Sequence, residues 1–112
     1  MDTYSDWLDA RNNAREAIGD VEREGQRKAI AEAEYYRAKA VCVARMKAEG
    51  HAATIITAMV KGDEEVNAKL QAFRMAEARY KAAQYAANLF IDEEAHTYNQ
   101  HKRALSGDSE RY

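Results

Sequence analysis

Residues 50–66, GHAATIITAMVKGDEEV, interrupt a chain that is otherwise charged, rich in alanine and helical in pattern. Gly50 is the residue type that most often occupies the left-handed position just after a helix. The run AATIITAMVK predicts a short helix over 52–61, and Gly62 is expected to end it. The stretch therefore predicts a corner at which one long helix stops and another begins.

The residues that follow this corner predict a long helix over about 63–105. Asp63 belongs to the residue types preferred at a helix N-cap. Glu64 and Glu65 would then lie in the first turn, where negative charge is favoured by the helix dipole. The last residues, 106–112 (SGDSERY), are polar and small, and we expect a disordered tail there.

The residues before the corner predict another long helix, over about 5–49, with Ser5 or Asp6 as its N-cap. Two glycines near 19–25 each cost about 1 kcal/mol against alanine in a helix, so the sequence allows either a continuous helix or a break there, with residues 1–20 as a separate helix. Apolar residues recur at steps of three and four, as one buried helical stripe requires. They are Ile18, Val21, Ile30, Ala33, Tyr36, Ala40, Val43 and Met46.

The composition favours an all-α fold in a single domain over 1–112. The chain has no proline and is dominated by alanine, which is the strongest helix former. Two long helices joined by a short connection run antiparallel. We therefore expect a long antiparallel helical hairpin with a short helix at its tip. Because alanine contributes little buried area, a dimeric helical bundle is expected.

Charge balance and composition give no support for membrane insertion, for secretion or for bulk attraction to nucleic acid. Lys and Arg number 17 and Asp and Glu number 19, which leaves a net charge of −2 and no bulk attraction to nucleic acid or membranes. No apolar run approaches the roughly 20 residues that a membrane span needs. The N-terminus is polar and acidic, unlike a secretory signal. With one cysteine, Cys42, the chain cannot form an internal disulfide and fits a reducing cytoplasm.

Few residues suggest catalysis or metal binding. Glu93 and His96 have the Glu-x-x-His spacing of di-iron bundles, but those bundles need a second copy of the motif, so a solvated helix face is favoured. Cys42 lies between two valines, with Arg45 three residues later, and is expected to be a packing residue. No phosphate-binding loop or hydrolase motif is present. We expect no catalytic residue, no metal and no cofactor.

Basic residues and tyrosines in the first helix raise the alternative of nucleic-acid binding. Basic side chains beside aromatic ones are typical of single-strand binders. Glutamates are interleaved, however, and the basic residues fall on two faces, which favours a structural role. The candidate contacts are Arg37, Lys39, Arg45 and Lys47, beside Tyr35 and Tyr36.

The corner itself has two further interpretations. A helix-turn-helix is disfavoured, because a second helix beginning DEEVNAK would bring carboxylates to DNA phosphates. Either Ile55, Ile56, Met59 and Val60 all cap the hairpin, or some of them form an exposed apolar patch that contacts a partner.

Over about residues 31–91 the chain resembles small helical proteins of phages and prophages of Gram-positive bacteria. The resemblance is carried by an A-E-x-x-Y helix beginning at Ala31, a corner with glycine, alanine and threonine, the segment KGDEEV, and AEARYKAA from Ala76. It implies an early-region accessory or anti-defence protein that acts by binding. It implies no catalytic residues.

Together these features predict a non-enzymatic phage-type protein that binds and inhibits a bacterial defence or DNA-processing protein, such as a CRISPR effector or a host nuclease. One mechanism would be phosphate mimicry by acidic side chains. The alternatives are a single-strand nucleic-acid-binding accessory factor for replication or recombination, and a structural or assembly protein. The predicted partner-binding residues are Thr54, Ile55, Met59, Lys61, Asp63, Glu64 and Glu65 at the tip, and Asp92, Glu93 and Glu94 in an acidic patch.

Overall fold

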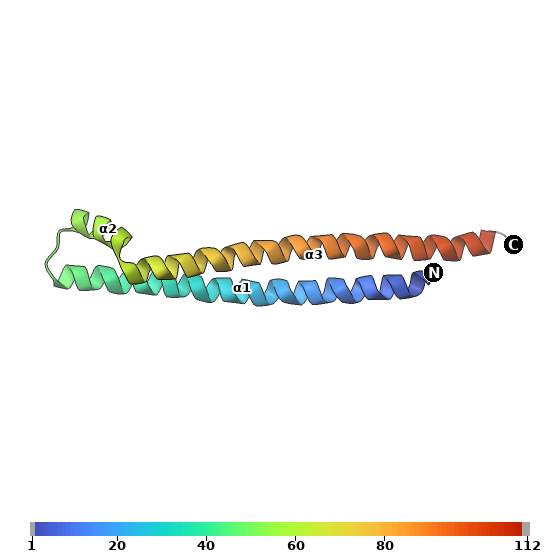
Figure 1. Cartoon of the computed structure of the whole chain (residues 1–112), viewed down its shortest axis with the longest axis horizontal. Coiled ribbons are helices and arrows are strands. Elements are labelled where there is room, and N and C mark those ends of the chain that lie inside the picture. The colour runs from blue at the N-terminus through green and yellow to red at the C-terminus, as the bar shows by residue number, and fades with distance from the viewer. Residues whose placement is uncertain (1, 111–112) are drawn as a thin grey trace. The chain divides into compact units, whose positions relative to one another are not determined.

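The computed structural model describes residues 2–110, with side chains placed up to Gly107. This part of the chain forms a helical hairpin without strands, which confirms the predicted all-α class. Its elements are α1 (Thr3–Ala48), α2 (Ala53–Gly62) and α3 (Glu64–Glu110) (Figure 1). The chain divides into two compact units. Unit 1 contains the segments up to Arg23 and from Lys81, and unit 2 contains Glu24–Tyr80.

The N-terminus of α1 differs from the prediction. The helix begins at Thr3, and the carboxylate of Asp2 accepts a hydrogen bond from the amide of Tyr4 at 3.1 Å. Asp2 is therefore the N-cap, whereas Ser5 and Asp6 lie inside the first turns. The first amides of a helix have no hydrogen-bond partner within the helix, and the carboxylate of Asp2 provides one for Tyr4.

The end of α1 follows the sequence prediction at Gly50, which has a φ of 87°. The amide of His51 donates to the carbonyl of Met46 at 3.2 Å, and the amide of Gly50 donates to that of Lys47 at 3.0 Å. These two bonds form a Schellman motif, which requires a left-handed residue at this position. A side chain at residue 50 would be strained there.

Of the two alternatives near 19–25, the structure shows the continuous one: α1 runs without a break through both glycines. Gly25 lies against an aromatic ring: a Cβ atom at this position would meet Cε2 of Tyr80 at 3.2 Å. Lys28 places its ammonium 5.2 Å from the centre of the same ring. Contact with Tyr80 therefore offsets the low helix propensity of Gly25 and keeps the helix intact.

The junction between α2 and α3 consists of a single extended residue, Asp63. Its carboxylate accepts a hydrogen bond from the amide of Val66 at 3.0 Å, so the predicted N-cap of α3 is confirmed. Its own amide donates to the carbonyl of Val60 at 3.2 Å. One residue thus ends α2 and starts α3.

The C-terminal segment also differs from the prediction. Helix α3 continues to Glu110, so residues 106–110 are helical where a disordered tail was expected. Gly107 keeps a negative φ, and the chain has no proline that would end the helix. Residues 111 and 112 lie outside the described part of the chain.

Unit 1 packs the beginning of α1 antiparallel to the end of α3. Trp7 contacts Tyr98 with ring centres 5.5 Å apart, and Thr3 hydrogen-bonds to His101 at 2.9 Å. The buried residues of this unit are small: Ala10, Ala14, Ala17, Ala87 and Thr97. Such a seam allows close approach of the two helices but buries little apolar area.

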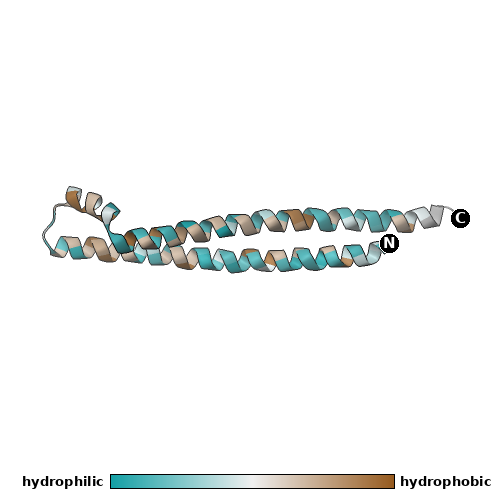
Figure 2. Cartoon of the chain, viewed as in Figure 1, coloured by the Kyte–Doolittle hydropathy of each residue, from teal (hydrophilic) through white to brown (hydrophobic). Residues whose placement is uncertain are grey.

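Unit 2 holds the better core. Cys42 and Met46 of α1, Ile56 and Val60 of α2, and Val66 of α3 form one buried cluster. Helices α1 and α3 are again antiparallel, with Glu34 and Lys69 paired at 3.5 Å across them. Figure 2 shows the apolar character of α2, which supplies two of the five core residues.

None of the three helices, over residues 2–110, contains an apolar segment long enough to cross a bilayer.

Candidate functional site

A groove of about 760 Å³ is formed in unit 2 by all three helices. Its volume falls within the roughly 300–1,000 Å³ of small-molecule pockets. The apolar side chains that line it are Tyr35 and Val43 of α1, Ala53, Ile56 and Val60 of α2, and Val66 and Leu70 of α3. This surface is called the basic groove below, because of the charges at its rim.

Four cationic side chains line the same groove: Lys39, Lys47, Lys61 and Arg74. The other polar members are the hydroxyl of Thr57 and the amide of Asn67, and no carboxylate of the described residues lines the groove. An apolar floor with charge of only one sign selects for a ligand that is both apolar and anionic.

The side chains of the groove are held in place by the packing of the corner. Ile56 and Val60 are buried on the inner side of α2 and thereby fix this helix against α1 and α3. Asn67 donates a hydrogen bond to the carbonyl of Lys61 at 3.0 Å, which ties the end of α2 to α3. Tyr35 is half-buried and its ring lies 6.2 Å from that of Phe73.

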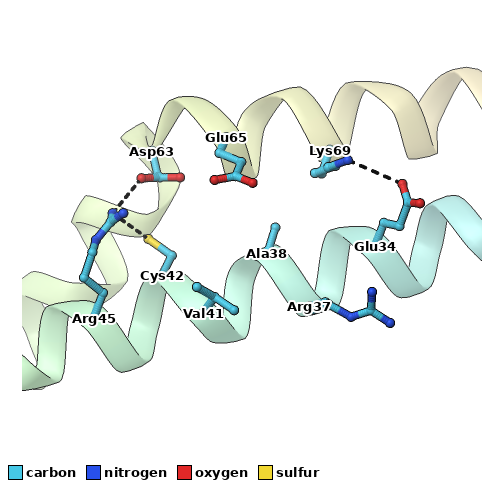
Figure 3. Close-up of a pocket in the computed structure, with 9 residues that line it drawn as sticks. All are labelled: Glu34, Arg37, Ala38, Val41, Cys42, Arg45, Asp63, Glu65 and Lys69. Atoms are coloured by element: carbon cyan, nitrogen blue, oxygen red, sulfur yellow. Dashed lines mark hydrogen bonds and ion pairs between the residues drawn. The ribbon is translucent and has the colours of Figure 1, made fainter.

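A second pocket of unit 2, of about 260 Å³, mixes charges of both signs (Figure 3). It is lined by Glu34, Arg37, Ala38, Val41, Cys42, Arg45, Asp63, Glu65 and Lys69. Two ion pairs occupy it: Arg45 with Asp63 at 3.0 Å, and Lys69 with Glu34 at 3.5 Å. Because these charges neutralise each other within the protein, the mixed-charge pocket is less suited to an ionic ligand than the basic groove.

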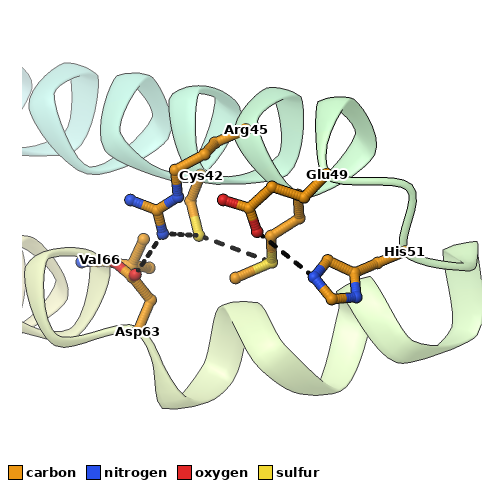
Figure 4. A network of polar contacts seen from close by, with 7 residues as sticks. Cys42, Arg45, Glu49, His51, Asp63 and Val66 are labelled. Atoms are coloured by element: carbon orange, nitrogen blue, oxygen red, sulfur yellow. Dashed lines mark hydrogen bonds and ion pairs between the residues drawn. The ribbon is translucent and has the colours of Figure 1, made fainter.

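Arg45 and Asp63 form a clamp between the end of α1 and the start of α3 (Figure 4). The amide of Val66 and then the guanidinium of Arg45 hold the pKa of Asp63 below its ordinary value. The hydrogen bond to Asp63 raises the pKa of Arg45. Asp63 was predicted as a partner-binding residue, but its carboxylate is taken up by these two internal contacts.

Cys42 lies in the buried cluster of unit 2, where burial raises the pKa of its thiol. Its Sγ is 4.0 Å from the sulfur of Met46 and accepts a hydrogen bond from Arg45 at 3.8 Å. A raised pKa leaves little thiolate at neutral pH, and only the thiolate is nucleophilic. These surroundings are those of a packing residue.

The apolar run of α2 is divided between two roles. Ile56 and Val60 are buried, as the folded-corner interpretation requires. Ile55 is 51% exposed and Met59 36% exposed, with Thr54 also exposed, as the apolar-patch interpretation requires. Each interpretation therefore describes one half of the run.

The remaining predicted tip residues do not form one surface. Lys61 lines the basic groove, whereas Glu65 lines the mixed-charge pocket. Glu64 is exposed at the first turn of α3.

The four candidate nucleic-acid contacts are separated in the same way. Lys39 and Lys47 line the basic groove, and Arg37 and Arg45 line the mixed-charge pocket. The predicted division of these basic residues between two helix faces is therefore confirmed.

The predicted acidic patch lies in unit 1. Asp92 and Glu93 are exposed, and Glu94 is half-buried. Glu93 lines a pocket of about 300 Å³ together with two carboxylates that the sequence analysis did not associate with it, Asp6 and Asp9. No group of three or more His, Cys, Asp or Glu side chains among the described residues could hold a metal ion.

Sequence reasoning missed Arg74, Leu70 and Val43 as neighbours in the basic groove. Leu70 and Arg74 are four residues apart on α3, and Lys39 and Val43 are four apart on α1, so each pair shares a helix face. The spacing of these pairs can be read from the sequence. The orientation of α2, which closes the groove with Ile56 and Val60, cannot be read from it.

A comparison of the chain with protein-family models, with curated proteins and with solved structures found no match.

Proposed function

We propose that this chain is a non-enzymatic protein-binding module whose basic groove receives an acidic amphipathic helix of a partner protein. One observation carries the proposal: four cationic side chains and no carboxylate surround an apolar floor. A helix that presents large apolar residues on one face, flanked by Asp and Glu, is complementary to both features. Docking of such a helix into an apolar groove is a common mode of peptide recognition.

The apolar side chains on the floor of the groove and the cations at its rim contribute differently to binding. Burial of apolar side chains of the partner supplies most of the affinity, at roughly 25 cal/mol per Å² removed from water. The cations select acidic partners and speed their association, and this contribution weakens as salt is added. Affinity is therefore expected to decrease with ionic strength without disappearing.

The class of the partner stays a prediction. The proposal that the chain inhibits a bacterial defence or DNA-processing protein rests on the resemblance of its residues 31–91 to phage proteins. Phosphate mimicry would use Asp92 and Glu93, which are exposed. Helix docking in the basic groove uses a different surface, so the two mechanisms can be tested separately.

Fluorescence anisotropy with a defined probe tests the proposal. The probe is a labelled synthetic helix with Leu and Phe on one face and Glu on both flanks, and its sequence-scrambled form is the negative control. The variant with Lys39→Glu and Arg74→Glu should bind the probe at least about tenfold more weakly, because two favourable charges become repulsive. Both positions lie well inside their helices, away from the dipole ends.

The matched control reverses Arg37 and Arg79 to Glu. These residues are exposed, lie on the same two helices, and do not line the basic groove. Equal losses in the control and the groove variant would show a general effect of charge and would contradict groove docking.

Single-stranded nucleic acid is the second candidate ligand, because Lys39 and Lys47 line the same groove as the half-buried ring of Tyr35. Leu70→Ala distinguishes the two ligands, since it removes apolar floor without changing charge. Helix docking predicts weaker probe binding by this variant. Tight binding of an oligonucleotide that Leu70→Ala leaves unchanged, with no binding of the helical probe, would favour the nucleic-acid function.

A further inference from the structure

Unit 1 presents a surface whose charge is opposite to that of the basic groove. Its pocket of about 300 Å³ is lined by three carboxylates, of Asp6, Asp9 and Glu93, and by no cation among the described residues. Phe90 lies among them with 40% of its surface exposed. This surface, called the acidic face below, combines one large apolar side chain with negative charge.

The packing of unit 1 gives a reason for Phe90 to be covered. The buried residues of this unit are alanines and one threonine, whereas the ring of Phe90, beside the carboxylates, keeps 40% of its surface in contact with water. Exposed apolar surface rimmed by polar groups is a feature of interaction sites.

We propose that the acidic face of one copy of this chain docks in the basic groove of a second copy. Phe90 would insert toward the apolar floor formed by Val43, Val66 and Leu70. The carboxylates beside Phe90 would approach the cations of the rim. This inference rests on the proposed function, because it names a second copy as an occupant of the same groove.

Charge complementarity supports a second copy over an unspecified apolar partner. The basic groove has four cations without a carboxylate, and the acidic face has three carboxylates without a cation. Like charges placed opposite each other in an interface repel, so the two surfaces favour each other over contacts between identical surfaces. The pairing is heterologous, and each chain offers both halves of it.

Analytical ultracentrifugation of two charge-reversed chains tests the pairing. The groove variant carries Lys39→Glu and Arg74→Glu. The face variant carries Asp9→Lys and Glu93→Lys. The unmodified chain should self-associate as concentration rises. Each variant alone should associate only at about tenfold higher concentration or more. The groove variant loses the net positive charge of its groove, and in the face variant two lysines outnumber the one remaining carboxylate.

An equimolar mixture of the two variants is the decisive sample. The native groove of the face variant then meets the native face of the groove variant, so pairing between the two variants should return to near the affinity of the unmodified contact. Circular dichroism of each variant must show unchanged helicity. Self-association of the unmodified chain that is not restored in the mixture would overturn the proposed pairing and place the contact elsewhere.

The helical probe separates failure of this inference from failure of the proposed function. An unmodified chain that stays monomeric at all concentrations but binds the probe in its groove would overturn self-docking and leave the proposed function intact. A monomeric chain that also fails to bind the probe would contradict both. Competition between the probe and self-association would support both at once.

Discussion

At the residue scale, Gly25 and Asp63 show which features of a helix can be predicted from residues nearby in the sequence and which cannot. Asp63 could be predicted as the N-cap of α3 because capping depends on a contact three residues away. The continuity of α1 through Gly25 could not be predicted, because Tyr80, 55 positions later in the numbering, packs against it. Helix propensity correctly describes the cost of this glycine but contains no information about a ring on another helix.

The two glycines of α1 provide a matched pair of substitutions. Gly19→Ala should raise the free energy of unfolding by up to about 1 kcal/mol, because its new Cβ meets only the flexible end of Arg23 at 3.5 Å. Gly25→Ala should gain less or lose stability, since Tyr80 must shift to admit a Cβ at 3.2 Å. Urea denaturation of both variants measures the difference. Equal stabilisation by the two substitutions would show that Tyr80 does not constrain residue 25.

At the scale of the element, α2 is a short helix with two apolar sides. The spacing and number of apolar residues in this segment predicted a helix with more apolar side chains than a corner needs. They did not indicate which of these residues face inward, because neighbours on α1 and α3 decide that. Ile56 and Val60 pack on Met46 and Val66, whereas Ile55 and Met59 remain exposed.

Substitution of adjacent isoleucines tests this division of α2. Ile56→Ala should lower the free energy of unfolding by about 2–4 kcal/mol, because it leaves a cavity in the core of unit 2. Ile55→Ala removes the same atoms from an exposed position and should change stability by no more than about 0.5 kcal/mol. Thermal denaturation followed by circular dichroism compares them. A larger loss for Ile55→Ala would mean that α2 packs with its other side inward.

At the scale of the whole molecule, the all-α hairpin could be predicted because alanine content, missing proline and the glycine corner all favour it. The basic groove could not, since its lining comes from three helices whose relative rotation the sequence does not state. The predicted tip residues were chosen by proximity along the chain. The groove instead joins residues from Tyr35 to Arg74 that share a surface.

The central claim is that the basic groove of unit 2 receives an acidic amphipathic helix. Methyl-labelled NMR spectra, recorded while the helical probe is added in excess, test it most directly. The account predicts large shifts for the methyl groups of Val43 and Leu70 on the groove floor. Val41, which lines the mixed-charge pocket, and Ile55, on the exposed side of α2, should change little. Unchanged floor methyls, or larger shifts at Val41 and Ile55, would contradict the account.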